Sequence, residues 1–145
     1  MKLPEYITKD EVKRVCRELK ISDWTKKKEA NVSMKEAKIV LSEVNSTNMD
    51  IDPSEFKAGL EVELEHGIQF RDANVTNNHP VLTGMIVLAH LKESLDYYRL
   101  LDVAELEGDL LKAISKGQVK KIRGYYERLA EARISLRKAE LKRLK

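Results

Sequence analysis

The stretch Pro-Val-Leu-Thr-Gly-Met-Ile-Val-Leu-Ala-His-Leu at residues 80–91 decides the fold. Pro80 suits the first turn of a helix, because the backbone N–H that proline lacks has no partner there in any case. The residues that follow are apolar on nearly every side, and such a helix belongs inside a domain rather than on its surface. The stretch therefore predicts a central helix over residues 80–93, packed against the helix before it.

Helix-start signals precede this stretch. The segments Thr8–Glu11 and Ser33–Glu36 are both capping boxes, in which a hydroxyl and a carboxylate three positions apart satisfy backbone N–H groups at the start of a helix. Asp52–Pro53 opens a third helix with a cap and a proline at the first helical position. Gly67 predicts the end of that helix, since glycine adopts the left-handed conformation that often follows the last turn.

The sequence after residue 93 continues the helical pattern. A break around Ser94–Asp96 precedes a helix that runs towards Lys116, Gly117 ends it, and a last helix fills residues 118–145. We find no strand-like alternation of useful length. The sequence predicts an all-α protein, a compact bundle of about five or six short helices with a long basic C-terminal helix.

Charge suggests how the chain is organised. Residues 118–145 carry ten Lys and Arg against three Glu, whereas the rest of the chain is mildly acidic. We therefore expect a helical body over residues 1–116 and a basic amphipathic helix over residues 117–145.

Composition excludes several classes of protein. The chain has 145 residues, of which 42% are hydrophobic and 35% are charged, as in a soluble globular protein rather than a disordered one. We find neither an apolar run of membrane-spanning length nor the apolar stretch of a secretory signal. A single cysteine, Cys16, cannot form an internal disulfide, so we expect a reducing compartment, the cytoplasm (of the host, if the protein is viral).

Glu63, His66, His90 and Glu93 form the first group of candidate site residues. Glu63 and His66 stand three positions apart and share a helix face. His90 is the one ionisable group in its apolar helix, and burying an imidazole costs free energy unless both ring nitrogens find partners. The preferred interpretation is a hydrogen-bonded core histidine. The alternatives are a metal site, as in a metal-dependent enzyme built on Glu63, His66 and His90, and general acid–base catalysis.

The polar segment at residues 67–79 is a second candidate. Asp72, Asn74, Thr76 and Asn77 favour turns, because their side chains bond nearby backbone groups. We expect them to form a network that caps the helix starting at Pro80, held by polar contacts to His66 and His90. A calcium loop is disfavoured because Asn77 occupies the position at which such a loop needs glycine.

The C-terminal helix is the third candidate, and three interpretations stay open for it. The first is a solvated face on a packed terminal helix, the second a surface for a protein partner or a second copy, and the third a nucleic-acid contact. The apolar stripe consists of Ile122, Tyr125, Leu129, Ala132, Leu136 and Ala139. A nucleic-acid contact would use Lys120, Lys121, Arg123, Arg133, Arg137 and Lys138.

No signature of catalysis or of a cofactor is present: we find no phosphate-binding glycine loop, paired zinc ligands or serine-hydrolase elbow. We therefore expect a protein without a cofactor. The first hypothesis for its function is a non-enzymatic interaction protein that contacts a partner, or its own copy, through the C-terminal helix. The second is nucleic-acid binding through the same helix.

Several short stretches between residues 52 and 101 together resemble a small uncharacterised family. They read Glu-Leu-Glu-His-Gly at 63–67, Asn-Val-Thr-Asn at 74–77, Thr-Gly-Met-Ile-Val-Leu-Ala-His-Leu-Lys-Glu at 83–93 and Asp-Tyr-Tyr at 96–98. The family is known only as a domain of unknown function, found in phage, viral and prokaryotic genomes. Asn78 and His79 stand where the family usually has two aspartates. The resemblance implies shared architecture, an association with viruses or mobile elements, and no established activity.

Overall fold

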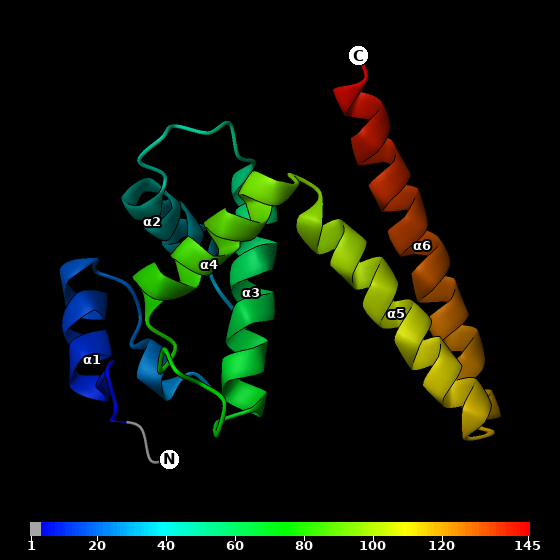
Figure 1. Ribbon diagram of the computed structural model, residues 1–145, viewed down its shortest axis with the longest axis horizontal. Helices are drawn as coiled ribbons and strands as arrows, with labels where there is room; N and C mark the ends of the chain where they lie inside the picture. Colours follow the sequence, from blue (N-terminus) through cyan, green and yellow to red (C-terminus); the bar gives the residue numbers. More distant parts are fainter. Residues whose placement is uncertain (1–3) are drawn as a thin grey trace. The chain divides into compact units, whose positions relative to one another are not determined.

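The computed structural model describes residues 4–145, and these residues form only helices and connecting segments, with no strand (Figure 1). The prediction of an all-α fold with a long basic C-terminal helix is therefore confirmed. In chain order the elements are α1 (Lys9–Glu18), the 3-10 helix η1 (Trp24–Lys26), α2 (Met34–Val44), α3 (Pro53–Gln69), α4 (Pro80–Glu93), α5 (Tyr97–Ser115) and α6 (Val119–Arg143).

The chain divides into two compact units, the first ending at Lys92 and the second spanning Glu93–Lys145. The boundary that we expected at residues 116–117 falls in the turn between α5 and α6, and these two helices pack together within the second unit. Residues 1–3 of the expected body lie outside the described residues. No helix in the described part of the chain is long and apolar enough to cross a membrane.

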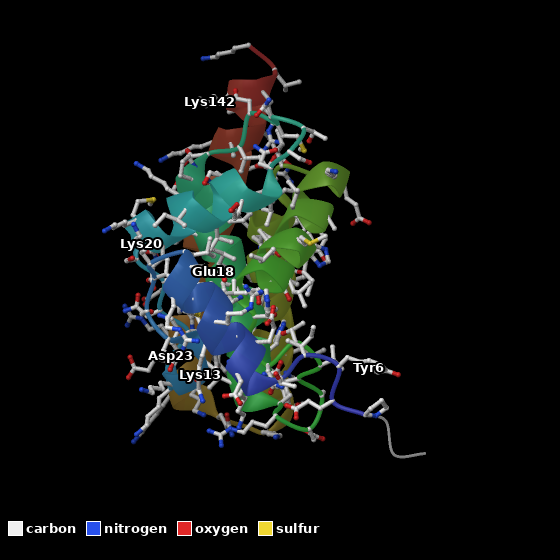
Figure 2. The ribbon with its side chains drawn as sticks, turned by 90° about the vertical axis from the view of Figure 1, so that its left-hand side faces the viewer. Tyr6, Lys13, Glu18, Lys20, Asp23 and Lys142 are labelled. Carbon is white, nitrogen blue, oxygen red and sulfur yellow. The ribbon has the colours of Figure 1, made fainter. Side chains whose placement is uncertain are left out.

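The predicted helix caps are present in the first unit. The Thr8 hydroxyl accepts a hydrogen bond from the Glu11 N–H at 3.2 Å, and the Asp52 carboxylate accepts one from the Ser54 N–H at 2.8 Å. The Glu11 carboxylate pairs with the Arg14 guanidinium rather than with the Thr8 N–H, so only one half of the capping box predicted at Thr8–Glu11 forms. Lys13 and Glu18 also lie on α1 (Figure 2). Each cap satisfies a donor that the first turn of a helix leaves without a partner.

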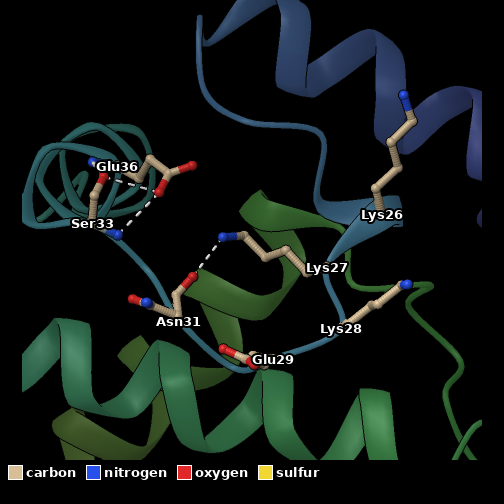
Figure 3. Close-up of a pocket in the computed structure, with 7 residues that line it drawn as sticks. All are labelled: Lys26, Lys27, Lys28, Glu29, Asn31, Ser33 and Glu36. Carbon is tan, nitrogen blue, oxygen red and sulfur yellow. Dashed lines mark hydrogen bonds between the residues drawn. The ribbon is translucent and has the colours of Figure 1, made fainter.

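Glu36 joins the start of α2 to the segment that follows α1. Its Oε2 accepts from the Ser33 N–H and hydroxyl at 3.0 and 2.9 Å, which completes the predicted capping box (Figure 3). Its Oε1 accepts from the Ser22 N–H and hydroxyl at 3.0 and 2.5 Å, and from the Trp24 indole N–H at 3.4 Å. Burial alone would raise the pKa of Glu36, but the donors of Ser22 and Ser33 outweigh it and lower the pKa to about 2.

The prediction that α4 is buried on all sides is wrong. Val87, Leu88 and Leu91 are buried, but Met85 is 55% exposed and Ile86 is 37% exposed. The helix has one inner face, which meets α2 and α3 near Gly84 (Figure 1). An apolar composition does not show which side of a helix its neighbours cover, because folded proteins keep much apolar surface exposed.

The prediction that Gly67 ends α3 is wrong, since the helix continues to Gln69. The glycine is required for a different reason. A Cβ atom at residue 67 would lie 2.2 Å from Asn78 Oδ1 and 2.9 Å from Asn74 Nδ2. The loop before α4 thus packs directly on the backbone of α3, and only glycine leaves room for it.

The second unit is a hairpin of two helices. Gly117, with φ of +63°, makes the turn between α5 and α6. Leu106 of α5 packs with Leu129 and Ala132 of α6 in a small apolar cluster. At the other end of the hairpin, the buried Asp96 carboxylate forms an ion pair with the Arg143 guanidinium. The two ends of α6 are therefore tied to the two ends of α5.

Replacing Gly84 with alanine tests how closely α4 fits its neighbours. The new Cβ would lie 2.6 Å from Val40 Cγ1, and Val40 is fully buried. We expect Gly84→Ala to lower the free energy of unfolding by about 1–2 kcal/mol, because overpacking outweighs the better helix propensity of alanine. Urea unfolding followed by the fluorescence of Trp24, the only tryptophan, measures it.

Gly124→Ala, in α6, is the matched control. Nothing lies within 4 Å of a Cβ at residue 124, so this variant should be stabilised by about 0.5–1 kcal/mol, as followed by circular dichroism. A Gly84→Ala protein as stable as the wild type would contradict the close fit.

Candidate functional site

His90 and Glu63 face each other across α4 and α3. His90 Nε2 lies 3.8 Å from Glu63 Oε1, and the two side chains are 30% and 17% exposed. His90 is thus half-buried rather than enclosed in the core. His66 and Glu93 are both exposed, and the His66 ring lies 6.4 Å from that of Phe70. The structure therefore brings together two of the four residues in this candidate cluster.

Glu63, His66 and His90 do not form a metal centre. Among residues 4–145, no group of three or more His, Cys, Asp or Glu side chains is arranged to hold one ion. A catalytic metal site needs at least three protein ligands around an open position. The geometry therefore gives the metal-dependent enzyme no support.

The most buried of the three histidines is His79, which the sequence analysis did not single out as a site residue. Its side chain is 7% exposed, and its Nδ1 accepts a hydrogen bond from the Leu82 N–H at 3.3 Å. His79 therefore caps α4 through its ring nitrogen. Burial lowers the pKa of His79, which the nearby Glu11 carboxylate opposes and the Arg14 guanidinium reinforces. The signal in the sequence was its position directly before Pro80, where a helix cap belongs.

The loop before α4 is held by asparagine side chains rather than by His66 and His90. Asn74 Nδ2 donates to the Gly67 carbonyl at 2.9 Å and to Asn78 Oδ1 at 2.8 Å, and the Thr76 hydroxyl donates to Asn74 Oδ1 at 3.3 Å. Asn77 Nδ2 donates to the Ile7 carbonyl at 2.6 Å, which ties the loop to the segment before α1. Of the four residues predicted for this network, Asp72 is the one that lies exposed.

The apolar stripe predicted on α6 faces α5 of the same unit. Leu129, Ala132 and Leu136 are buried, and the other stripe residues, Ile122, Tyr125 and Ala139, are half-buried. Tyr125 packs against the cluster formed by Leu106, Leu129 and Ala132. This stripe is therefore covered within the chain and does not offer a surface for a partner.

A second apolar row runs along α6 on its exposed side. Val119, Tyr126, Ile134 and Leu141 are 76%, 62%, 55% and 59% exposed. Their spacing of seven, eight and seven residues places them on one side of a helix with 3.6 residues per turn. Ala130, also exposed, lies in the same row. The helix thus has two apolar sides, of which one is bare.

An exposed apolar row also runs along α5. Leu100, Ala104, Leu111 and Ile114 are exposed, and Glu107 completes a spacing of four, three, four and three residues. Glu107 pairs with Arg133 of α6 at 2.6 Å, and Arg133 follows Tyr126 by seven and Ala130 by three residues, so it lies on the side of α6 that carries the second row. This ion pair places both rows on one side of the hairpin. We call this side, with Leu100, Ala104, Leu111, Ile114, Val119, Tyr126, Ala130, Ile134 and Leu141, the bare face.

The residues predicted to contact nucleic acid fall into two groups. Arg123 pairs with Glu127 at 2.8 Å, Arg133 with Glu107 at 2.6 Å and Arg137 with Glu140 at 2.6 Å. Each of these arginines already has a carboxylate partner in its own unit, which reduces the charge it offers to a phosphate. The other three, Lys120, Lys121 and Lys138, are exposed.

The lowered pKa of His79 predicts a pH dependence of stability. The unfolded chain takes up a proton at this residue as the pH falls through about 6.5, whereas the folded chain does so only at lower pH. The contribution of His79 to the free energy of unfolding is therefore complete above about pH 6.5 and declines below it. His79→Asn keeps a side-chain oxygen as a cap and should flatten the dependence between about pH 6.5 and 5 in Trp24-monitored unfolding.

His66→Asn is the control, since it removes an exposed histidine from the same unit. We expect this variant to keep the pH dependence of the wild type. A pH dependence that persists in His79→Asn and disappears in His66→Asn would contradict the assignment.

Comparison with known proteins places the chain in a family. A family model described as "Protein of unknown function (DUF5661)" matches residues 12–107, which is more than half of the chain. The match includes the stretches at residues 63–98 that resemble an uncharacterised family, and it ends within α5, before α6 begins. No curated protein and no solved structure matches the chain. The chain belongs to the DUF5661 family of proteins of unknown function.

Proposed function

We propose that the protein is a non-enzymatic interaction protein whose α5–α6 hairpin joins two copies of the chain. The observation that carries the proposal is the bare face, in which the exposed apolar residues of both helices lie on one side of the hairpin. Apolar residues that recur along one side of a helix are the pattern by which helices pack in bundles, and within this face Glu107 is neutralised by its ion pair with Arg133. Two such hairpins, face to face, form a four-helix bundle.

Charge favours a second copy as the occupant of the bare face. α5 carries four Asp and Glu against two Lys and Arg, whereas α6 carries nine Lys and Arg against three Glu. A twofold axis that lies in the interface and runs parallel to the helices places α5 of each copy beside α6 of the other. The acidic helix then meets the basic helix twice, so the surface is complementary to itself.

The size of the bare face also fits a dimer. A helix of 25 residues is about 37 Å long at 1.5 Å per residue, and two helices side by side are about 20 Å wide. The face therefore covers on the order of 700 Å², close to the roughly 800 Å² per partner of a standard interface.

The proposal modifies the hypothesis from the sequence in one respect. The C-terminal helix remains the contact element, but the contact uses the row of Val119, Tyr126, Ile134 and Leu141 rather than the stripe that packs on α5. The association with viruses or mobile elements that the family resemblance implied stays a prediction.

A charge placed in the bare face should separate the copies. Ile134→Glu puts a carboxylate at a residue that is 55% exposed within the chain, so the hairpin itself loses little. We expect the wild type to be a dimer at micromolar concentration. We expect Ile134→Glu to raise the dissociation constant by tenfold or more, since about 1.4 kcal/mol corresponds to tenfold. Analytical ultracentrifugation measures the constant, and circular dichroism checks the helix content.

Val75→Glu is the matched control. Val75 is 82% exposed in the loop before α4, so the substitution makes the same chemical change away from the hairpin, and the dimer should persist. A wild type that is monomeric at all concentrations would contradict the proposal. A monomer that binds duplex DNA with an affinity that falls steeply with salt would favour the nucleic-acid alternative instead.

A further inference from the structure

A small cationic cavity lies in the first unit, and none of its lining residues belongs to the bare face. It has a volume of about 230 Å³ and is bounded by the start of α1, the η1 segment, the end of α3 and the loop before α4. Its charged lining residues are Lys9, Lys27 and Arg71, and no carboxylate lines it. We propose that this cavity, which we call the cationic cavity, binds a phosphate group.

The charges of the cationic cavity are not neutralised by partners within the first unit. In the described residues, Lys9 and Arg71 form neither an ion pair nor a hydrogen bond. Lys27 Nζ donates to the Asn31 carbonyl at 2.5 Å, and a carbonyl leaves the positive charge of the ammonium in place (Figure 3). Lys9, Lys27 and Arg71 all contribute positive charge to the lining of one cavity, and this charge attracts an anion.

The acids that touch the lining residues do not enter the cavity. Glu5 accepts from Asn77 Nδ2 at 2.6 Å, and Asp23 accepts from the Thr25 hydroxyl at 2.6 Å, but neither carboxylate is a lining residue. These two bonds fix the orientation of Asn77 and Thr25. The lining therefore combines cationic side chains that have no carboxylate partner with polar side chains that are held in place.

The walls of the cationic cavity come from separate parts of the first unit and are braced against one another. Lys27 lies in the segment that Glu36 anchors through Ser22 and Trp24. Arg71 lies in the loop before α4, which Asn74 fastens to the Gly67 carbonyl. A site whose charged groups stand on anchored segments binds an ion with a smaller loss of conformational entropy.

The size and charge of the cavity select the class of ligand. A volume of about 230 Å³ is below the roughly 300–1,000 Å³ of sites that enclose drug-sized molecules. Lysine ammonium and arginine guanidinium groups are the side chains that bind phosphate oxygens most strongly. The ligand is therefore free phosphate or the phosphorylated end of a larger molecule. Lys9 is the first residue of α1, and the positive end of that helix dipole also favours an anion.

Isothermal titration calorimetry of the full chain tests the proposal. The probes are inorganic phosphate, a nucleoside monophosphate and sodium chloride, each at the same ionic strength. We expect saturable binding of inorganic phosphate with one site per chain, and none of chloride. Tighter binding of the nucleoside monophosphate than of phosphate would identify the larger ligand as the source. Equal affinities would identify free phosphate.

Arg71→Gln and Lys28→Gln form a matched pair of variants. Both remove one positive charge from an exposed side chain, but Arg71 lines the cationic cavity and Lys28 does not. We expect Arg71→Gln to weaken phosphate binding about tenfold or more, and Lys28→Gln to change it less than twofold. Arg71 and Lys28 are both exposed, so the midpoint of urea unfolding of both variants should equal that of the wild type.

Two results would overturn the proposal. One is the absence of saturable binding at phosphate concentrations up to about 10 mM. A site with a millimolar dissociation constant, which corresponds to about 4 kcal/mol, would be saturated at that concentration. The other is an equal loss of affinity in Arg71→Gln and Lys28→Gln, which would show general attraction to a basic surface. The test is independent of self-association, since Arg71→Gln and Ile134→Glu lie in different units and use different readouts.

Discussion

The first unit depends on a buried carboxylate that forms no ion pair with any residue that the structure describes. Glu36 is 9% exposed, and its two oxygens accept hydrogen bonds from both polar groups of Ser22, from both of Ser33 and from the Trp24 indole. A buried charge of this kind is stable only if its donors are fixed in place. In return, the carboxylate fixes a stretch of chain with little regular structure, from the end of α1 to the start of α2. That stretch includes Lys27, and so the constraint on Glu36 also positions one wall of the cationic cavity.

The two units are organised in different ways. The first unit uses specific polar contacts: the Glu36 carboxylate, the Asn74 amide on the α3 backbone and the His79 cap of α4. The second unit uses helix pairing, with an apolar cluster in the middle and the Asp96–Arg143 ion pair at one end. The family match covers most of the first unit and stops within α5. The match includes every lining residue of the cationic cavity except Lys9, whereas α6, which supplies most of the proposed contact between copies, lies outside it.

Sequence predicted the helices well because their start signals are local. A hydroxyl such as that of Ser33 caps the N–H groups of its own first turn, so two residues suffice to place a helix. The predictions were wrong at positions whose role depends on residues far away along the chain. Gly67 was interpreted as a helix stop, but its role is set by Asn78, eleven residues away. His90 was taken for the buried imidazole, whereas His79 is the one that is buried. Which helix side is covered is a tertiary property, and for the same reason α6 was expected to present the stripe that α5 covers.

The stability of a Glu36→Gln variant tests the central claim most directly. An amide at this position offers one acceptor oxygen and brings an NH₂ group towards hydrogen-bond donors, so buried donors lose their partner. Urea unfolding of the wild type and the variant at neutral pH, followed by Trp24 fluorescence, gives the difference in their free energies of unfolding. The account predicts a loss of about 2–3 kcal/mol, which shrinks as the pH falls from about 4.5 towards 2, where the wild-type carboxylate takes up its proton. Equal stabilities at neutral pH would contradict it.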